Sequence, residues 1–221
     1  ERFAYRPLRH APRLAPLITA IGASIVLQNV AMMVWSRNPL AFPQIIPNRV
    51  FAIGEATISM VQIAIILGSV AMMAALTFFV YRTRLGIAMR ATSQNPRVAG
   101  LMGVDIDRVI AATFMLGAAL AAVAGVMVGT YYGIAHYTMG SLLGLKAFAA
   151  AVLGGIGNLA GAMLGGMLLG IVEALGAGYI GDLTNNVFGS NYQDVFAFMV
   201  LIAVLVFRPS GLLGERVGDR A

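Results

Sequence analysis

Long stretches without a charged residue most constrain what this chain can fold into. Such stretches run from Leu14 to Trp35, from Ile58 to Tyr81 and from Val109 to Gly133. An α-helix rises about 1.5 Å per residue, so about 20 apolar residues cross the hydrocarbon core of a bilayer, which is about 30 Å thick. Each of these stretches therefore predicts a full-length transmembrane helix.

Three further apolar blocks are less simple. Leu159–Ile180 is interrupted only by Glu173, while Leu142–Ile156 contains Lys146. Leu142–Ile156 and Val195–Phe207 are short for a crossing, so each forms either a full span or a half-span covered by other helices. The sequence predicts an all-α, polytopic transmembrane helix bundle of five to six spans in a single domain, residues 1–221. The predicted spans are 14–35, 58–81, 109–133, 142–156, 159–180 and 195–207, and the longest cytoplasmic connection is 82–108.

The composition agrees with a membrane protein. Hydrophobic residues make up 59% of the chain and charged residues only 11%, against about 25% charged residues in soluble domains. A net charge of +6 can favour nucleic acid, but nearly all the basic residues flank apolar blocks. We therefore expect them to face membrane lipid, with no nucleic-acid partner. The absence of cysteine excludes disulfides and thiolate metal sites.

Arginines gather at one side of the predicted spans. Connections on the cytoplasmic side of a membrane are enriched in Lys and Arg. Most of the 15 basic residues fall on one side, against Arg37 and Arg49 on the other. Both termini are therefore expected in the cytoplasm, a parity that six crossings satisfy. The residues assigned to the cytoplasmic side are Arg2, Arg6, Arg9, Arg13, Arg82, Arg84, Arg90, Arg97, Arg108, Arg208, Arg216 and Arg220.

Small residues recur at every fourth position along the predicted spans. One series includes Gly117, Gly125 and Gly129, and a second includes Gly161 and Gly165. Lipid gives helices no hydrophobic reason to associate, so close backbone contact through small residues takes that role. We expect these helices to pack on protein, either within one subunit, against a partner subunit, or along a surface that slides during gating.

The connection between the second and third predicted spans contains the pattern of a short helix. Asn95 suits the N-cap position and Pro96 the first helical position. Val98, Leu101 and Met102 follow at i, i+3 and i+4 and so form one apolar face. A helix this short depends on packing. We expect its apolar face to dock on the membrane surface, on the chain's own bundle, or in a groove of a soluble partner.

No enzymatic motif is present in the sequence. The only lysine, Lys146, is not part of a glycine-rich phosphate loop, so the chain is not expected to hydrolyse ATP by that mechanism. The two histidines, His10 and His136, lack the spacing of metal ligands. We expect no catalytic residue, no metal and no cofactor.

Lys146 and Glu173 fall inside predicted spans, where charge is costly and is usually paired or functional. They lie at similar distances before and after the expected turn near Leu159. Two helical arms would bring them to similar depth, where they pair directly or through water. In the alternative, Lys146 reaches the outer interface and Glu173 meets other polar groups. Asn158, beside the same turn, either links helices or lines a pathway.

Several segments resemble one known family. Arg90–Asp107, which includes RATSQNPRVAGLMG, and Gly144–Asn158, GLKAFAAAVLGGIGN, look like the permease subunits of branched-chain amino-acid ABC importers of the LivH type. Gly170–Leu175, Arg208–Gly214 and the opening Glu1–Arg9 are similar to the same family. The match covers essentially the whole chain. Family chains begin with further spans, so this sequence is expected to be truncated at its N-terminus.

The resemblance implies a type II-like ABC importer permease in the bacterial inner membrane. It implies three kinds of partner: a second permease subunit, two cytoplasmic ATP-binding subunits, and a periplasmic or extracellular solute-binding protein. Asn95, Pro96, Val98, Leu101 and Met102 would then form the coupling helix seated in a groove of the ATPase. ATP hydrolysis would belong to that partner.

The expected function is the membrane-spanning permease subunit of an ATP-driven importer for branched-chain or similar hydrophobic amino acids. Alternating access would be the mechanism, with Lys146, Asn158 and Glu173 as candidates for gating or structural roles. No residue identifies the solute, so a permease for a monosaccharide or another solute is the alternative within the transporter class. From another class, the alternative is a membrane channel or scaffold that works without nucleotide.

Overall fold

The computed structural model describes residue 5 and residues 15–44, 46–47, 49–53, 56–155, 157–183, 192–208 and 210–214. These residues contain eight helices and two small two-stranded sheets. The chain divides into two compact units, Glu1–Gly140 and Ser141–Ala221. Several residues used in the sequence analysis lie outside the described part of the chain: Arg2, Arg6, Arg9, His10, Arg13, Leu14, Arg216 and Arg220.

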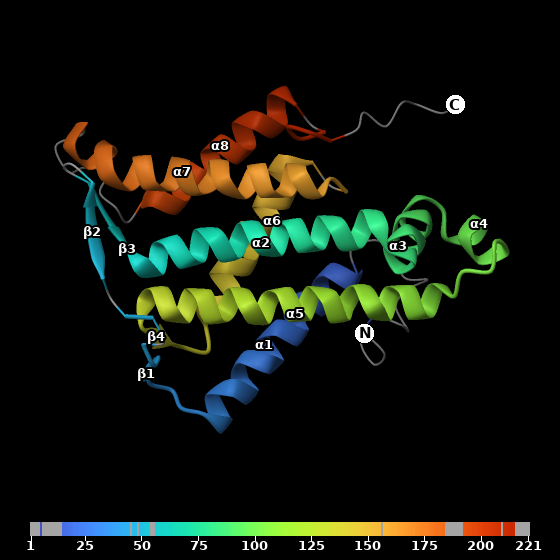
Figure 1. Ribbon diagram of the computed structural model, residues 1–221, viewed down its shortest axis with the longest axis horizontal. Helices are drawn as coiled ribbons and strands as arrows, with labels where there is room; N and C mark the ends of the chain where they lie inside the picture. Colours follow the sequence, from blue (N-terminus) through green and yellow to red (C-terminus); the bar gives the residue numbers. More distant parts are fainter. Residues whose placement is uncertain are drawn as a thin grey trace. The chain divides into compact units, whose positions relative to one another are not determined.

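Three apolar helices form the frame of the first unit. They are α1 (Ala15–Val34), α2 (Met60–Arg82) and α5 (Ile106–Tyr132), at the positions of the first three predicted spans. α2 and α5 lie side by side and run in opposite directions (Figure 1). Both are long and apolar enough to cross a membrane, and α1 is an apolar helix of 20 residues.

The local sequence determines where α2 and α5 begin and end. Ser59 and Gln62 form a reciprocal capping box, in which the Ser59 hydroxyl accepts from the Gln62 amide at 3.2 Å and the Gln62 side chain accepts from the Ser59 amide at 2.9 Å. The side chain of Asp105 caps the start of α5. α5 ends at Gly133, whose φ of 68° is a left-handed conformation that glycine adopts without strain.

Two short antiparallel ribbons depart from the predicted all-α class. β1 (Leu40–Ala41) pairs with β4 (Ile134–Ala135), and β2 (Val50–Ile53) pairs with β3 (Ala56–Ser59). All four strands lie just outside the long helices of the first unit. The search for apolar stretches of membrane length treated these residues as connections, so it gave no reason to expect strands there.

Two short helices connect α2 to α5. They are α3 (Arg84–Gln94) and α4 (Pro96–Leu101). The sequence analysis predicted only α4, because an Asn-Pro pair is a recognisable helix start. α3 has a weak apolar pattern of its own and packs against α2 and α5, so its formation depends on tertiary contacts.

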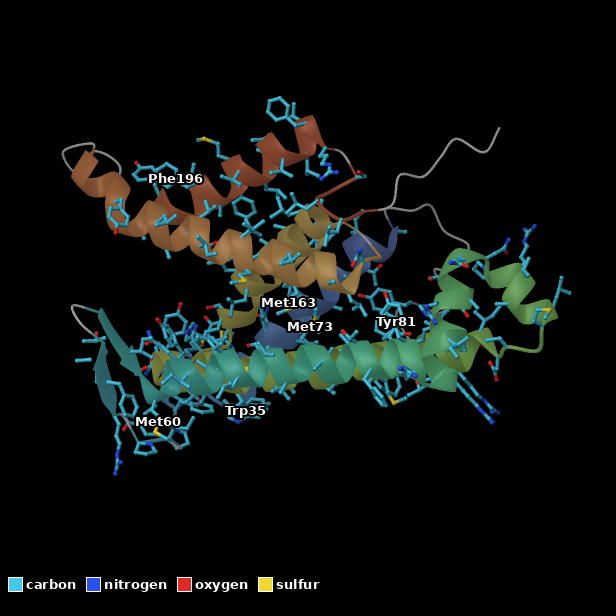
Figure 2. The ribbon with its side chains drawn as sticks, turned by 45° about the horizontal axis from the view of Figure 1, so that its top comes forward. Trp35, Met60, Met73, Tyr81, Met163 and Phe196 are labelled. Carbon is cyan, nitrogen blue, oxygen red and sulfur yellow. The ribbon has the colours of Figure 1, made fainter. Side chains whose placement is uncertain are left out.

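The second unit consists mainly of three helices. They are α6 (Met139–Gly154), which begins just before the unit does, α7 (Leu159–Leu183) and α8 (Gln193–Phe207). The part of α7 up to Tyr179 is long and apolar enough to cross a membrane, and α6 and α8 are shorter. α7 and α8 pack on each other, with the Phe196 ring against Gly176 (Figure 2). The buried core of the unit is Ala149, Ala150, Leu153, Leu169 and Ala197.

The segment after α8 turns back onto the end of α6. The Leu212 amide donates to the Leu153 carbonyl at 2.8 Å, which gives a partner to one of the carbonyls that a helix C-terminus leaves free. Gly211 and Gly155 meet at this point with φ angles of 79° and 107°. A Cβ on Gly211 would overlap the backbone of Gly155, so this contact requires glycine.

Apolar side chains on the long helices are mostly exposed in the described structure. α2 has no buried residue among those described, and its Leu67 and Phe78 are 64% and 66% exposed. Large exposed apolar surface is unfavourable in water. It is the surface expected of helices that face lipid or further protein.

Candidate functional site

An ionic cluster connects the three helices of the second unit. Nζ of Lys146 on α6 donates to Oε2 of Glu173 on α7 at 3.0 Å. The same nitrogen lies 2.7 Å from Oδ1 of Asp194 in the first turn of α8. The predicted pairing of Lys146 with Glu173 is therefore confirmed, and the cluster has a third member, Asp194, that the sequence analysis did not identify.

The cluster is largely shielded by its own helices. The side chains of Lys146 and Glu173 are 21% and 20% exposed, and that of Asp194 is 33% exposed. At 2.7 Å, the contact of the Asp194 oxygen with the Lys146 ammonium is a close ion pair. One ammonium group thus faces two carboxylates. Buried charge is costly unless it is paired, so Lys146 holds both acids near one point.

A second candidate region is α4, where the predicted capping is present. Oδ1 of Asn95 accepts from the amides of Arg97 at 3.1 Å and Val98 at 3.2 Å, and Pro96 occupies the first turn. The three predicted apolar residues point away from the rest of the described structure: Val98 is 52%, Leu101 88% and Met102 80% exposed.

The face of α4 that packs within the first unit is instead that of Ala99, which is 4% exposed. Of the three docking alternatives, the chain's own bundle therefore finds no support in the described residues. The membrane surface and a soluble partner remain.

The sequence profile of the family "branched-chain amino acid transport system / permease component" matches residues 4–205. The chain belongs to this family. The resemblance drawn from the loop and glycine-rich motifs is confirmed, and the chain is a transport permease component with helices long and apolar enough to cross a membrane.

Individual relatives of the permease are similar along nearly all of its length. It is 49% identical to the high-affinity branched-chain amino acid transport system permease protein BraD of Pseudomonas aeruginosa, over 97% of this chain and 69% of the relative. It is 44% identical to LivH of Escherichia coli, over 97% of this chain and 68% of the relative. A probable LivH of Methanocaldococcus jannaschii is 33% identical over 63% of this chain and 44% of the relative. No solved structure gives a significant match.

The glycines of the permease at the α6–α7 contact pack against backbone. A Cβ on Gly161 would overlap the carbonyl of Gly154, and a Cβ on Gly165 would overlap the carbonyl of Ala150. Two helices whose backbones approach this closely require glycine at the contact. For this series, packing within one subunit is therefore what the structure shows.

The glycines of α5 behave differently. Nothing lies within 4 Å of a Cβ built on Gly117 or Gly125. A Cβ on Gly129 would meet the ring of Phe42 at 2.9 Å, a flexible side chain rather than backbone. Contact of this series with a partner subunit, or a sliding surface, stays a prediction.

Asn158 fixes the turn between α6 and α7. Its Oδ1 accepts from the amide of Gly161 at 3.0 Å, which caps the start of α7. Its Nδ2 donates to the carbonyl of Leu213 at 2.9 Å, in the segment that follows α8. Both polar groups of the side chain are used within the second unit, as expected of an amide that links elements.

Asp194 could have been found from the sequence. The last apolar block was taken to start at Val195, directly after this acid, so Asp194 was left in the connection before it. A carboxylate in the first turn of a helix is favoured by the helix dipole, so Asp194 belongs to α8. Counting it would have shown that Lys146 shares the helices of the second unit with more than one acid, Glu173 and Asp194 among them.

Proposed function

We propose that this permease is the membrane-spanning subunit of an ATP-driven importer for branched-chain or similar hydrophobic amino acids. The observation that carries the proposal is the similarity to two bacterial permeases named for high-affinity branched-chain amino acid transport, at 49% and 44% identity over 97% of the chain. A monosaccharide permease has helices and small residues of this kind, but none of the relatives reported above is named for sugar transport.

Both units would belong to one transmembrane permease domain, residues 1–221, of a type II-like fold. Helices occupy all six predicted span ranges, and three of them have full membrane length. The short helices α6 and α8 would cross with the support of their neighbours, giving six spans and both termini of this sequence in the cytoplasm. The arginines of residues 82–108 support this orientation, because cytoplasmic connections are enriched in arginine and this segment, with α3 and α4, connects α2 to α5.

In this proposal α4 is the coupling helix. Its exposed Val98, Leu101 and Met102 would enter a groove of a cytoplasmic ATP-binding subunit, with Asn95 and Pro96 fixing the start of the helix. Apolar anchors in a groove are how a short amphipathic helix gains affinity. Two such ATPases, a second permease subunit and a solute-binding protein would complete the importer, and ATP hydrolysis on the ATPases would drive alternating access.

The Lys146–Glu173–Asp194 cluster and Asn158 would keep the second unit together while other parts of the permease move. Gly161 and Gly165 would serve this intra-unit packing. Gly117, Gly125 and Gly129 would contact a partner subunit or a moving helix. The cluster also has the composition of a gate, because a single cation can exchange between two acids on different helices.

Transport by the full-length permease in proteoliposomes, with its ATPase and binding protein, tests the substrate and the energy source. We expect uptake of labelled leucine, isoleucine or valine that requires ATP, and none of labelled glucose or ribose. Sugar uptake would support the monosaccharide alternative. Amino-acid flux without nucleotide would support the channel alternative.

Replacing Val98, Leu101 and Met102 together by serine tests the coupling helix. We expect loss of ATPase co-purification and of uptake, because the apolar anchors are removed. The matched control replaces Val50 and Phe51 by serine. These two residues lie on β2, beyond the opposite end of α2, and are 60% and 47% exposed. Equal loss in both variants, or retained co-purification in the triple variant, would contradict the role given to α4.

A further inference from the structure

A single residue separates α2 from α3. Thr83 is the C-cap of α2 and at the same time the N-cap of α3, with an extended backbone of φ −95° and ψ 153°. The chain therefore changes direction at one residue, with no flexible linker between a long apolar helix and a short helix outside it (Figure 1).

The Thr83 side chain joins the two helices at this corner. Its hydroxyl donates to the Phe79 carbonyl in the last turn of α2 at 2.7 Å and accepts from the Gly86 amide in the first turn of α3 at 3.1 Å. The backbone adds two bonds, from the Thr83 amide to Phe79 at 3.1 Å and from the Ile87 amide to Thr83 at 3.0 Å. One hydroxyl thus uses its donor on one helix and its acceptor on the other.

Gly86 brings the backbones of the two helices into direct contact. It is buried, and a Cβ built on it would overlap the carbonyl oxygens of Phe79 and Val80. Both obstacles are backbone atoms in the last turn of α2, so no side-chain movement could make room. The start of α3 is therefore pressed against the end of α2.

A cation–π contact adds a third connection. The guanidinium of Arg90 on α3 lies 4.7 Å from the centre of the Tyr81 ring on α2. Figure 2 shows Tyr81 at the end of α2, where α3 begins. Tyr81, Thr83, Gly86 and Arg90 together form what we term the α2–α3 elbow.

The same construction occurs again one helix later. Asn95 is the C-cap of α3 and the N-cap of α4, and its backbone amide donates to the Ala91 carbonyl at 3.1 Å. α2, α3 and α4 thus follow one another through two single-residue corners. The Thr83 side chain bonds to both of its helices, whereas the Asn95 side chain bonds to α4. Between α2 and α4 only Thr83 and Asn95 lie outside a helix.

We propose that Thr83 and Gly86 are positioning residues that make the α2–α3 elbow rigid, so that movement of α4 by the ATPase is transmitted to the membrane helix α2. This inference rests on the proposed role of α4 as the coupling helix. In this proposal both residues act through α2 and α3 rather than by touching solute or ATPase. A loose elbow lets α3 and α4 move while α2 stays, and ATP is then hydrolysed without transport.

The test compares Thr83→Val with Thr83→Ser in the full-length permease, reconstituted with its ATPase and binding protein. Valine keeps the shape but removes both hydroxyl bonds, whereas serine keeps them. For Thr83→Val we expect solute moved per ATP hydrolysed to fall by roughly fivefold or more, the lower range of coupling between linked sites, with ATPase co-purification retained. Thr83→Ser should restore wild-type coupling, and Gly86→Ala should resemble Thr83→Val.

Thr130→Val on α5 is the matched control. The Thr130 hydroxyl also donates to a carbonyl four residues earlier, Val126 at 2.8 Å, but it caps no second helix. Its replacement should leave coupling unchanged. Equal coupling in Thr83→Val and wild type would overturn the proposal, and so would failure of Thr83→Ser to behave differently from Thr83→Val.

If a variant at Thr83 or Gly86 does not assemble, a distance measurement on protein in which both residues are unchanged still tests the proposal. The printed sequence has no cysteine, so nitroxide labels can be placed at Leu67 on α2 and Ile87 on α3, both exposed. We expect the same narrow distance distribution without nucleotide and with ATP bound. A broad distribution, or a shift between the two states, would refute a rigid elbow.

The proposed function fails separately. Loss of coupling in Thr83→Val together with retained ATPase binding in the Val98, Leu101 and Met102 variant would remove α4 as the docking element and, with it, the proposed route from α4 to α2, although Thr83 would still affect coupling. The reverse pair of results would keep α4 and remove the elbow.

Discussion

The two glycine series of this permease have the same spacing and different surroundings. On α7, Gly161 and Gly165 press against the backbone of α6, whereas Gly117 and Gly125 on α5 have open space around them. A repeat of small residues therefore predicts that a helix can approach another closely, but not which helix it approaches. The difference indicates that the α6–α7 contact is completed within the chain and that the α5 ridge is available to something else.

The largest expected effect is at the ionic cluster, which joins α6 and α7 beside the glycine contact. Lys146→Met leaves Glu173 and Asp194 together without their cation. We expect a loss of stability of about 3 kcal/mol or more, as when one partner of a buried ion pair is removed. Thermal unfolding in detergent measures it.

The neutral triple variant Lys146→Met, Glu173→Gln and Asp194→Asn is its control. It removes all three charges, so it should recover most of the lost stability. A triple variant no more stable than Lys146→Met alone would show that the three residues do not act as one cluster.

Gly165→Ala tests the packed side of the comparison directly. The added methyl group overlaps the Ala150 carbonyl, and backbone must shift to accommodate it, so we expect a loss of about 1–3 kcal/mol. Gly170→Ala on the same helix is the control, since nothing lies within 4 Å of its Cβ position. Equal melting temperatures for the two variants would mean that α6 and α7 are not in backbone contact.

Asn158→Ala tests how much the α6–α7 contact depends on the hydrogen bonds of the turn between the two helices. The change removes the bonds to Gly161 and Leu213, and we expect a loss of about 1–2 kcal/mol in the same unfolding assay. Asn29→Ala is the comparison variant, because within the described part of the chain the Asn29 side chain bonds only to the carbonyl of Ile25 in its own helix. A smaller loss at Asn158 than at Asn29 would argue against a linking role.

The smallest effect is expected on the open side, at Gly117. Because nothing surrounds its Cβ position, Gly117→Ala should leave stability unchanged or raise it by about 0.5–1 kcal/mol through better helix propensity. Gly117→Leu should reduce co-purification of a second permease subunit if that subunit covers the ridge. A loss in Gly117→Ala as large as that in Gly165→Ala would remove the distinction between the two series.

Several features of the candidate site were predictable from sequence, each for a local reason. Lys146 and Glu173 stand out because charge is rare within apolar stretches, and Asn95-Pro96 because capping acts over a few residues. Asp194 was missed because it sits at the edge of its span. The elbow was missed because it depends on how closely α3 approaches α2. Gly86 permits that approach, but a single glycine in the sequence does not predict it.

The sequence by itself determined that this protein lies in a membrane, where its long helices are, and to which family it belongs. Uncharged length and short motifs carry that information, because the bilayer and the capping of helix ends both act on consecutive residues. Only the tertiary structure decided which glycines touch backbone, which acids share Lys146, and that Thr83 and Gly86 hold two helices at one corner. These contacts join residues from different helices, and their partners are set by packing, which no periodicity along one helix contains.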